Sequence, residues 1–600
     1  METHPRRTVL GVALGTAVGA AAAVATSGAA QAGPGRSDAA HRRRFVKRRL
    51  KAMSLEEKVG QLFTTYAYGQ SATSTDATDV ANNRAAHGVD NAAQLIDKYK
   101  LGGIIYFAWS NNVADPDQIT ALSNGLQDAA TGRCGTPLII ATDQEHGLVT
   151  RIGPPATQLP GAMALGATHD PESARAAAVI AGQELRAMGL NQNFAPDADV
   201  NVNPANPVIG VRSFGSDAEH VAAFVAAQVE GYQERGDLAS AVKHFPGHGN
   251  TEDDSHHSLP RIDHTFEEWQ AIDAPPFRAA IASGVDVVMT AHIQFPALDE
   301  SLTPATLSQP ILTGLLREEL GYDGLVITDS LQMEGVREGY GDDRVPVLAL
   351  LAGADVLLMP MDIDLAYNAV LTAVAEGEIT KRRIDQSVTR VLDLKYRLGL
   401  FDDPYADPDE VAGIVGIPEH LEAAQAISDT SVTLVTNDGT LPMATDGGHV
   451  LVTGWGEATA VTIADEFTAR GWTPSTLVTG LAPTPAQIEA AVAAAEGQGL
   501  IVVSTNGVAD NPAQAELVRA LAATGVPLVA LGVRNPYDIA YFTDEVNAYL
   551  ATYSYAADAL QSAVGAVVGS LAPQGKLPVD VPSADDPDEV LFAFGHGLTY

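Results

Sequence analysis

Eight short apolar runs alternate with helical patterns between residues 54 and 359, and this alternation constrains the fold more than any other feature of the chain. The runs are rich in Val, Ile and Leu, and they span residues 59–66, 102–108, 137–143, 191–200, 239–245, 285–293, 324–330 and 354–360. Apolar strands that alternate with helices are typical of a parallel sheet covered on both faces. Eight such units predict an α/β fold that begins with an N-terminal (β/α)8 TIM-like barrel. A doubly wound open sheet is the alternative.

Polar side chains stand at the carboxyl ends of these predicted strands: Asp143, Asp197, Lys243, His244, His292 and Asp329. In a (β/α)8 barrel the active site is built at that end of the strands. Six polar residues at the same end are hard to explain by structural roles alone, so we expect a catalytic site there. For Asp197 and the nearby Asp199 we expect packing of a loop rather than chemistry.

The last third of the chain repeats the α/β alternation on a smaller scale. Further strands are expected at residues 431–437, 448–455, 499–505, 527–533 and 548–554. They predict an α/β/α sandwich over residues 425–600, behind a catalytic barrel over residues 45–400. The segment between them, residues 401–424, begins with a proline-rich acidic stretch and is predicted to be a linker.

Residues 1–32 have the pattern of a secretory signal peptide. Arg6 and Arg7 precede a small apolar run, and Ala30-Gln31-Ala32 offers a cleavage site. We therefore expect an exported, extracellular protein. The paired arginines resemble a twin-arginine signal, with an ordinary signal as the alternative.

Charge and cysteine content exclude several classes of partner and of stabilising device. The formal net charge is −38, which argues against nucleic acid or an anionic membrane surface as a partner. Beyond the N-terminus no apolar run is long enough to predict a membrane span. Cys134 is the only cysteine, so no internal disulfide is expected. The oligomeric state stays open.

The segment KHFPGHGNTEDDSHHSLP, residues 243–260, holds four of the 15 histidines. A metal site is one interpretation, but Pro246 and Gly247 prevent the helix that would align His244 with His248. A solvated loop is a second interpretation, although the segment starts at a strand end. Acid/base chemistry is the third, because a carboxylate at Asp254 can orient the imidazole of His256.

This segment resembles the signature loop of family 3 glycoside hydrolases of the β-N-acetylglucosaminidase (β-N-acetylhexosaminidase) type. Three other stretches are similar to motifs of that family: TDQEHGLVTRI (142–152), GVRSFG (210–215) and LVITDSLQMEG (325–335). The closing FGHGLTY also resembles the end of the family's second domain. The resemblance covers roughly residues 50 to 600.

The resemblance implies a retaining hydrolase that needs no metal or cofactor. Asp329 would be the nucleophile, and His256, oriented by Asp254, would be the acid/base. The residues that would bind the sugar are Asp143, Arg151, Arg212, Lys243 and His244. The substrate would be a glycan that ends in N-acetylglucosamine (GlcNAc), either a peptidoglycan fragment or a chitooligosaccharide.

Structural roles are the alternatives for these residues. Asp143 and Arg151 can form an ion pair, Arg212 can cap a loop, and Asp329 can cap a helix. Two departures from the family pattern stand close to Asp143: the family's Glu-Gly-Gly is Glu145-His146-Gly147, and its usual arginine is Leu148. We expect His146 either to crowd the sugar or to change the turn.

Three competing functions stay open at this point. β-Glucosidases or β-xylosidases of the same family usually take their acid/base from a glutamate of the second domain. A β-N-acetylglucosaminide phosphorylase would use phosphate in place of water. A wall-binding protein without activity would not need Asp329, Asp254 and His256 together.

Overall fold

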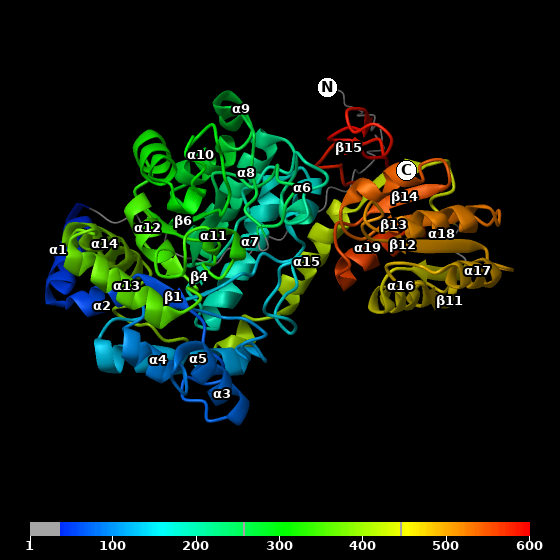
Figure 1. The fold of residues 1–600 in the computed structure, drawn as a ribbon. Helices are drawn as coiled ribbons and strands as arrows, with labels where there is room; N and C mark the ends of the chain where they lie inside the picture. The colour runs from blue at the N-terminus through cyan, green and yellow to red at the C-terminus, as the bar shows by residue number, and fades with distance from the viewer. Residues whose placement is uncertain (1–35, 256–257, 444–446) are drawn as a thin grey trace, which may run out of the picture.

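The computed structural model describes residues 36–255, 258–443 and 447–600. These residues form two α/β domains side by side, with helix α15 (Pro418–Ser431) running between them (Figure 1). The predicted signal peptide, His256 and His257 lie outside the described residues. Among the described residues, we find no helix that combines the length and the apolar character needed to span a membrane.

The first domain is built on a parallel sheet in the order β7-β6-β5-β4-β3-β2-β1-β8. A bridge between Ile327 and Val356 links the two ends of this order, so the sheet is a nearly closed barrel. The predicted TIM-like barrel is therefore confirmed. The strands are β1 (Phe63–Thr65), β2 (Gly103–Ile105), β3 (Ile139–Thr142), β4 (Gln192–Asn193), β5 (Ala239–Phe245), β6 (Val287–Thr290), β7 (Leu325–Ile327) and β8 (Leu357–Leu358).

Most of these strands are shorter than the apolar runs that predicted them. The run 191–200 contains only the two-residue strand β4, because Pro196 has no N–H to donate to a ladder and the chain then turns into a loop. The residues of the predicted runs that follow the observed strands form the loops at the carboxyl end of the barrel, and those loops carry the polar side chains.

Helices cover the outside of the barrel (Figure 1). Helix α7 begins after Asp170, whose side chain accepts a hydrogen bond from the Glu172 amide, and its alanine-rich face is buried. The predicted helix 218–236 ends early as an α-helix and closes with a π turn. The elements are α1 (Arg36–Ala52), α2 (Leu55–Gly60), α3 (Ala77–His87), α4 (Ala92–Tyr99), α5 (Pro116–Cys134), α6 (Ala162–Ala167), α7 (Pro171–Ala187), η1 (Gly210–Arg212), α8 (Ala218–Glu230), η2 (Gly231–Arg235), α9 (Phe266–Ala271), α10 (Ala274–Ala282), η3 (Ala305–Leu307), η4 (Pro310–Glu319), α11 (Glu334–Arg337), α12 (Val345–Ala352), α13 (Ile363–Glu376), α14 (Lys381–Arg397) and η5 (Val411–Gly413).

The second domain is an α/β sandwich around a six-stranded sheet in the order β11-β10-β12-β13-β14-β9, in which only β9 runs antiparallel. The sequence did not predict β11, because its residues TPSTLV are polar and exposed at the sheet edge. The elements are β9 (Thr433–Asn437), β10 (His449–Gly454), α16 (Glu457–Ala469), β11 (Thr473–Val478), α17 (Pro485–Ala494), β12 (Leu500–Thr505), α18 (Ala513–Ala522), β13 (Leu528–Gly532), η6 (Pro536–Tyr541), β14 (Ala548–Ala551), α19 (Ala557–Val567), β15 (Val581–Pro582) and β16 (Val590–Phe592).

The segment predicted as a linker is packed against the barrel. It contains η5 and the first half of α15, and His420 of α15 contacts Glu184 of α7 at 2.8 Å. The Glu184 carboxylate also accepts hydrogen bonds from Thr157 and from the Gly416 amide. The connection between the two domains is thus an ordered part of the barrel surface.

Candidate active site

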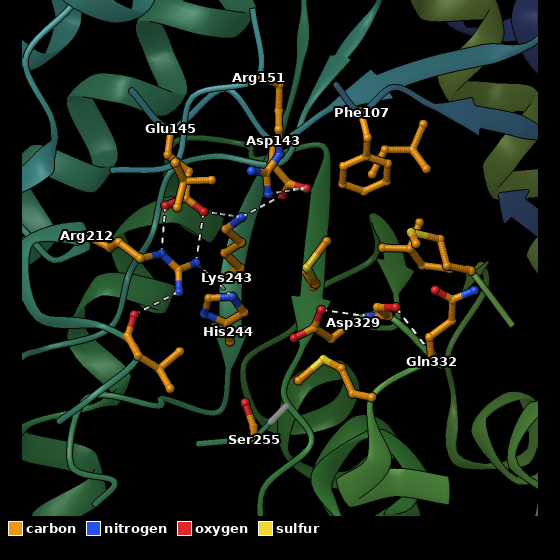
Figure 2. A pocket seen from close by; sticks show the side chains of 18 of the residues that line it. Phe107, Asp143, Glu145, Arg151, Arg212, Lys243, His244, Ser255, Asp329 and Gln332 are labelled. Atoms are coloured by element: carbon orange, nitrogen blue, oxygen red, sulfur yellow. Dashed lines mark hydrogen bonds and ion pairs between the residues drawn. The ribbon is translucent and has the colours of Figure 1, made fainter. Parts of the chain in front are cut away.

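A cavity of about 440 Å³ opens at the carboxyl end of the barrel strands. Of the residues singled out from the sequence, Asp143, Arg151, Arg212, Lys243, His244 and Asp329 line it (Figure 2). His292 lies behind the wall, with its ring nitrogens near the Thr306 hydroxyl and the Ser330 carbonyl. The parallel sheet brings these strand ends together although up to 186 residues separate them in the chain.

Asp329 follows strand β7 and stands at one side of the cavity (Figure 2). Burial by itself would raise the pKa of this carboxyl, but the nearby His244 and His292 outweigh burial and lower the pKa below its usual value. The Ser330 amide, which donates to Asp329 Oδ1 at 2.7 Å, adds to this effect. Asp329 does not cap a helix, since α11 begins only at Glu334 with Met333 at the cap position. It is therefore an ionised carboxylate in the wall of the cavity.

Glu145 joins two of the predicted sugar-binding cations. Its Oε1 lies 2.5 Å from Lys243 Nζ, and both of its oxygens accept hydrogen bonds from the Arg212 guanidinium at 2.8 and 2.9 Å. The side chain is nearly buried, and burial opposes ionisation, but Arg212 and Lys243 hold the pKa of Glu145 far below its usual value. We did not single out Glu145 from the sequence, although it lies two residues after Asp143.

Asp143, Arg151 and Arg212 also make some of the structural contacts that were the alternatives to sugar binding. Asp143 Oδ1 is 3.0 Å from Lys243 Nζ, whereas Arg151 Nη2 reaches Asp143 Oδ2 only at 3.9 Å. The Arg151 guanidinium also lies over the Phe107 ring, 5.4 Å from its centre. Arg212 donates to the Val208 carbonyl at 3.2 Å in addition to its pairing with Glu145. These structural contacts hold the side chains at the cavity wall.

Asp199 connects His244 with the histidine-rich loop. One oxygen of Asp199 lies 2.7 Å from His244 Nδ1, and the other accepts the His248 amide at 2.6 Å. Burial and the adjacent Asp199 raise the pKa of Asp197 well above its usual value. Both aspartates are buried behind the wall, as a role in packing requires.

The oxygens and nitrogen of Asp197, Asp199 and His244 lie within 4.8 Å of one another, which is close enough for a shared cation. The Arg212 guanidinium, however, already stands 3.6 Å from Asp197 Oδ2. A divalent cation at this place would meet the positive charge of Arg212. The donor set is therefore better satisfied by the arginine and by hydrogen bonds than by a metal ion.

His248 anchors the loop that leads toward the predicted acid/base dyad. Its ring nitrogens lie 2.9 Å from the Ser255 hydroxyl and 3.0 Å from the Thr251 hydroxyl. Burial lowers the pKa of His248 to about 4, so the ring is neutral at neutral pH. Ser255 lines the cavity directly beside Asp254 in the chain. Because His256 lies outside the described residues, its pairing with Asp254 stays a prediction.

The family departures at His146 and Leu148 lie outside the described lining of the cavity. His146 has φ = 67° and a buried ring, whose Nδ1 accepts the Leu159 amide at 3.4 Å. Burial lowers its pKa to about 4. Neither His146 nor Leu148 is among the described residues that line the cavity. The two outcomes expected for His146, crowding of the sugar and a changed turn, both stay predictions.

The second domain supports the loop that carries Arg212. Val211 belongs to a buried apolar cluster whose other members include Ile539 and Leu577 of the sandwich. A Cβ atom on Gly210 would lie 2.7 Å from Asn535 Oδ1, so the two domains touch closely there. Asn201, earlier in the same stretch, donates to the Tyr537 hydroxyl at 2.9 Å. The position of Arg212 thus depends on both domains.

Comparison with known proteins identifies the family of the chain. Residues 54–394 match the glycosyl hydrolase family 3 N-terminal domain, and residues 432–600 match the C-terminal domain of the same family. The chain is 34% identical to "Beta-hexosaminidase A" of Pseudoalteromonas piscicida over 547 residues, which cover 82% of this chain and 90% of that protein.

Two further similarities concern a curated protein and a solved structure. The chain is 33% identical over 409 residues to "Beta-N-acetylglucosaminidase/beta-glucosidase" of Cellulomonas fimi, covering 66% of this chain and 68% of that protein. A family 3 β-N-acetylglucosaminidase structure from Paenibacillus sp. str. FPU-7 superposes with a TM-score of 0.80 and 38% identity, over 88% of this chain and 99% of that one. The chain therefore belongs to glycoside hydrolase family 3, and it is a glycoside hydrolase.

Proposed function

We propose that the protein is an exported retaining exo-β-N-acetylglucosaminidase. It removes terminal GlcNAc from chitooligosaccharides or peptidoglycan fragments. The observation that carries this proposal is the ionised Asp329 carboxylate, which faces a cavity whose opposite side holds a fixed set of charged donors and acceptors (Figure 2). A cavity of about 440 Å³ suits one terminal sugar and part of the next residue.

The reaction proceeds in two displacements. An Asp329 oxygen attacks the anomeric carbon, the bond to the leaving oxygen breaks, and His256 gives that oxygen a proton. In the second step His256 takes a proton from water, the water oxygen attacks the anomeric carbon, and the bond to Asp329 breaks. Asp254 orients His256 in both steps. Since both displacements invert the anomeric centre, the product keeps the β configuration.

The charged wall binds the terminal sugar. Lys243, His244 and Asp143 offer donors and acceptors that suit sugar hydroxyls, and Arg151 and Arg212 add guanidinium donors. Glu145 holds Lys243 and Arg212 in place before the sugar arrives. This preorganisation keeps the cost of ordering the side chains low when substrate binds.

Trapping of the intermediate tests the nucleophile. A 5-fluoro analogue of GlcNAc with a fluoride leaving group should label the intact enzyme by one sugar mass, and peptide mapping should place the label on Asp329. Asp329→Gly with added azide should release the glycosyl azide of α configuration, because azide then attacks directly. Labelling of another residue would exclude Asp329 as the nucleophile.

Substrate preference separates the main alternatives. We expect p-nitrophenyl β-N-acetylglucosaminide to be hydrolysed faster than the glucoside and the xyloside, and a preference for either of these would favour the β-glucosidase or β-xylosidase alternative. The name of the Cellulomonas fimi relative includes both sugars, so the glucoside is the essential comparison. Added phosphate should not increase turnover; formation of sugar 1-phosphate would instead identify a phosphorylase.

A further inference from the structure

A large aromatic side chain stands exposed where the cavity opens. Trp109 lines the cavity, yet 53% of its surface is accessible to solvent. It follows strand β2, on the same face of the barrel as the charged residues. An exposed indole at the edge of a polar cavity loses the free energy of burial, so its place suggests a partner that covers it.

Three neighbouring rings hold the indole without covering it. Phe107 stacks on Trp109 with 4.8 Å between ring centres and 21° between the planes. Tyr66 and Tyr68 contact the indole at steep angles, with ring centres 4.8 and 5.8 Å away. Because these contacts leave about half of the side chain exposed, Trp109 presents a broad surface in a fixed orientation.

The backbone beneath Trp109 is also fixed. Asn112, which is buried, donates hydrogen bonds to the carbonyls of Ala67 and Gly69 at 3.0 Å each. The Ser110 hydroxyl donates to the Phe107 carbonyl at 3.0 Å. The loop that carries the indole is therefore tied to the loop that follows β1, and ligand binding does not have to order it.

The aromatic group also connects with the loop that bears the nucleophile. Gln332 follows Asp329 by three residues, lines the cavity, and donates to the Tyr66 hydroxyl at 3.4 Å. The loop that carries Asp329 is therefore joined to the aromatic group beside which Phe107 and Trp109 stand.

The charges of the cavity disfavour an acidic leaving group. Among the described residues that line it, Arg212 and Lys243 pair closely with carboxylates of the same wall, whereas Arg151 reaches Asp143 only at 3.9 Å. The chain as a whole carries a formal net charge of −38. The two paired cations are less available to a lactyl or peptide carboxylate, which the overall charge would also repel. A neutral sugar ring, by contrast, offers an apolar C–H face to an indole.

We propose that Trp109, supported by Phe107, Tyr66 and Tyr68, forms a subsite that stacks the neutral pyranose ring next to the scissile bond. This inference rests on the proposed function and adds the class of leaving group to it. The preferred substrate is then a chitooligosaccharide, and Trp109 determines specificity without touching the reacting atoms.

Two substrates that differ only in the second ring test the proposal. N,N′-diacetylchitobiose places a pyranose on Trp109, whereas methyl β-N-acetylglucosaminide does not reach it. In Trp109→Ala we expect kcat/KM for chitobiose to fall about tenfold and kcat/KM for the methyl glycoside to change less than about twofold. Trp109→Phe should recover most of the loss. An equal loss on both substrates would overturn the proposal.

Leu148→Ala is the matched control. Leu148 is exposed and apolar like Trp109, but it is not among the described residues that line the cavity, so its replacement should leave both substrates unchanged. A GlcNAc-anhydromuramyl-peptide provides the acidic leaving group. If the unmodified enzyme hydrolysed it with a higher kcat/KM than chitobiose, the preference for a neutral ring would be wrong.

A second pair of substrates separates this proposal from the proposed function. If the enzyme preferred cellobiose and methyl β-glucoside, the assignment of GlcNAc would fail. The ratio of kcat/KM for cellobiose to kcat/KM for the methyl glucoside, compared between Trp109→Ala and the unmodified enzyme, would still report stacking of the second ring.

Discussion

The two walls of the cavity are built in different ways. On the charged wall, Lys243, Arg212 and Glu145 already satisfy one another through short contacts in a nearly buried network. On the aromatic wall, Trp109 is held by neighbouring rings and half of its surface stays free. The charged wall is thus a coupled unit in which one change affects every member, whereas the aromatic wall offers a surface that one substitution can remove alone. We expect losses on the charged wall to affect all substrates and losses on the aromatic wall to affect only those with a second ring.

The largest expected effect is that of Asp329→Asn, which removes the proposed nucleophile that both kinds of substrate need. We expect kcat to fall by on the order of 10⁴-fold or more on chitobiose and on the methyl glycoside alike. Circular dichroism and thermal unfolding should show an intact fold. Retained turnover on either substrate would contradict the proposed mechanism.

Glu145→Gln should break the coupling of the charged wall. It leaves Lys243 and Arg212, both nearly buried, without their shared carboxylate. We expect the free energy of unfolding to fall by about 3 kcal/mol and kcat/KM to fall on every substrate. Urea unfolding measures the first and steady-state kinetics the second. Glu172→Gln is the control, because its pair with Arg175 has a largely exposed carboxylate and should contribute under about 1 kcal/mol.

His87 should make the stability of the protein depend on pH near the aromatic wall, because its buried ring lies 4.9 Å from that of Tyr66. Burial lowers the pKa of His87 to about 4, below the usual value of 6.5. Between these two values the unfolded chain binds more protons than the folded one, so this residue makes stability rise with pH up to about 6.5.

His87→Phe tests this effect, since phenylalanine keeps the ring but cannot take up a proton. We compare the free energy of unfolding of the variant with that of the unmodified enzyme, using urea unfolding at each pH. This difference should favour the variant by up to about 2 kcal/mol more at pH 5 than at pH 8. The same difference between variant and parent at both pH values would show that His87 does not titrate in this range.

Tyr537→Phe should have the smallest effect, because Tyr537 is not among the described residues that line the cavity and acts on the charged wall only through the loop that carries Asn201 and Arg212. The variant loses the hydrogen bond from Asn201 across the domain boundary. We expect KM to rise about threefold on both substrates with little change in kcat. A change confined to chitobiose would instead connect the second domain with the subsite at Trp109.

Much of this fold could be predicted from the sequence, since buried parallel strands must be apolar and must alternate with helices. That pattern located all eight barrel strands and the order of the two domains. It did not locate β11, because an exposed edge strand such as TPSTLV carries no apolar signal. The composition of the predicted linker also did not reveal that His420 would pair with the buried Glu184.

For the site, the sequence by itself determined which residues are candidates for the chemistry. The strand-end residues Asp143, Lys243 and Asp329, and the order Asp-Ser-His after Asp253, can be read without a structure, because the chemistry depends on residue type and on short spacing. Only the tertiary structure decided how these groups are paired and what faces them. Glu145 between Arg212 and Lys243, Val211 within the apolar cluster of the second domain, and Trp109 on the ring of Phe107 are results of packing. Partners separated by tens to hundreds of residues meet only when the barrel closes and the second domain docks on it, and no local pattern records those contacts.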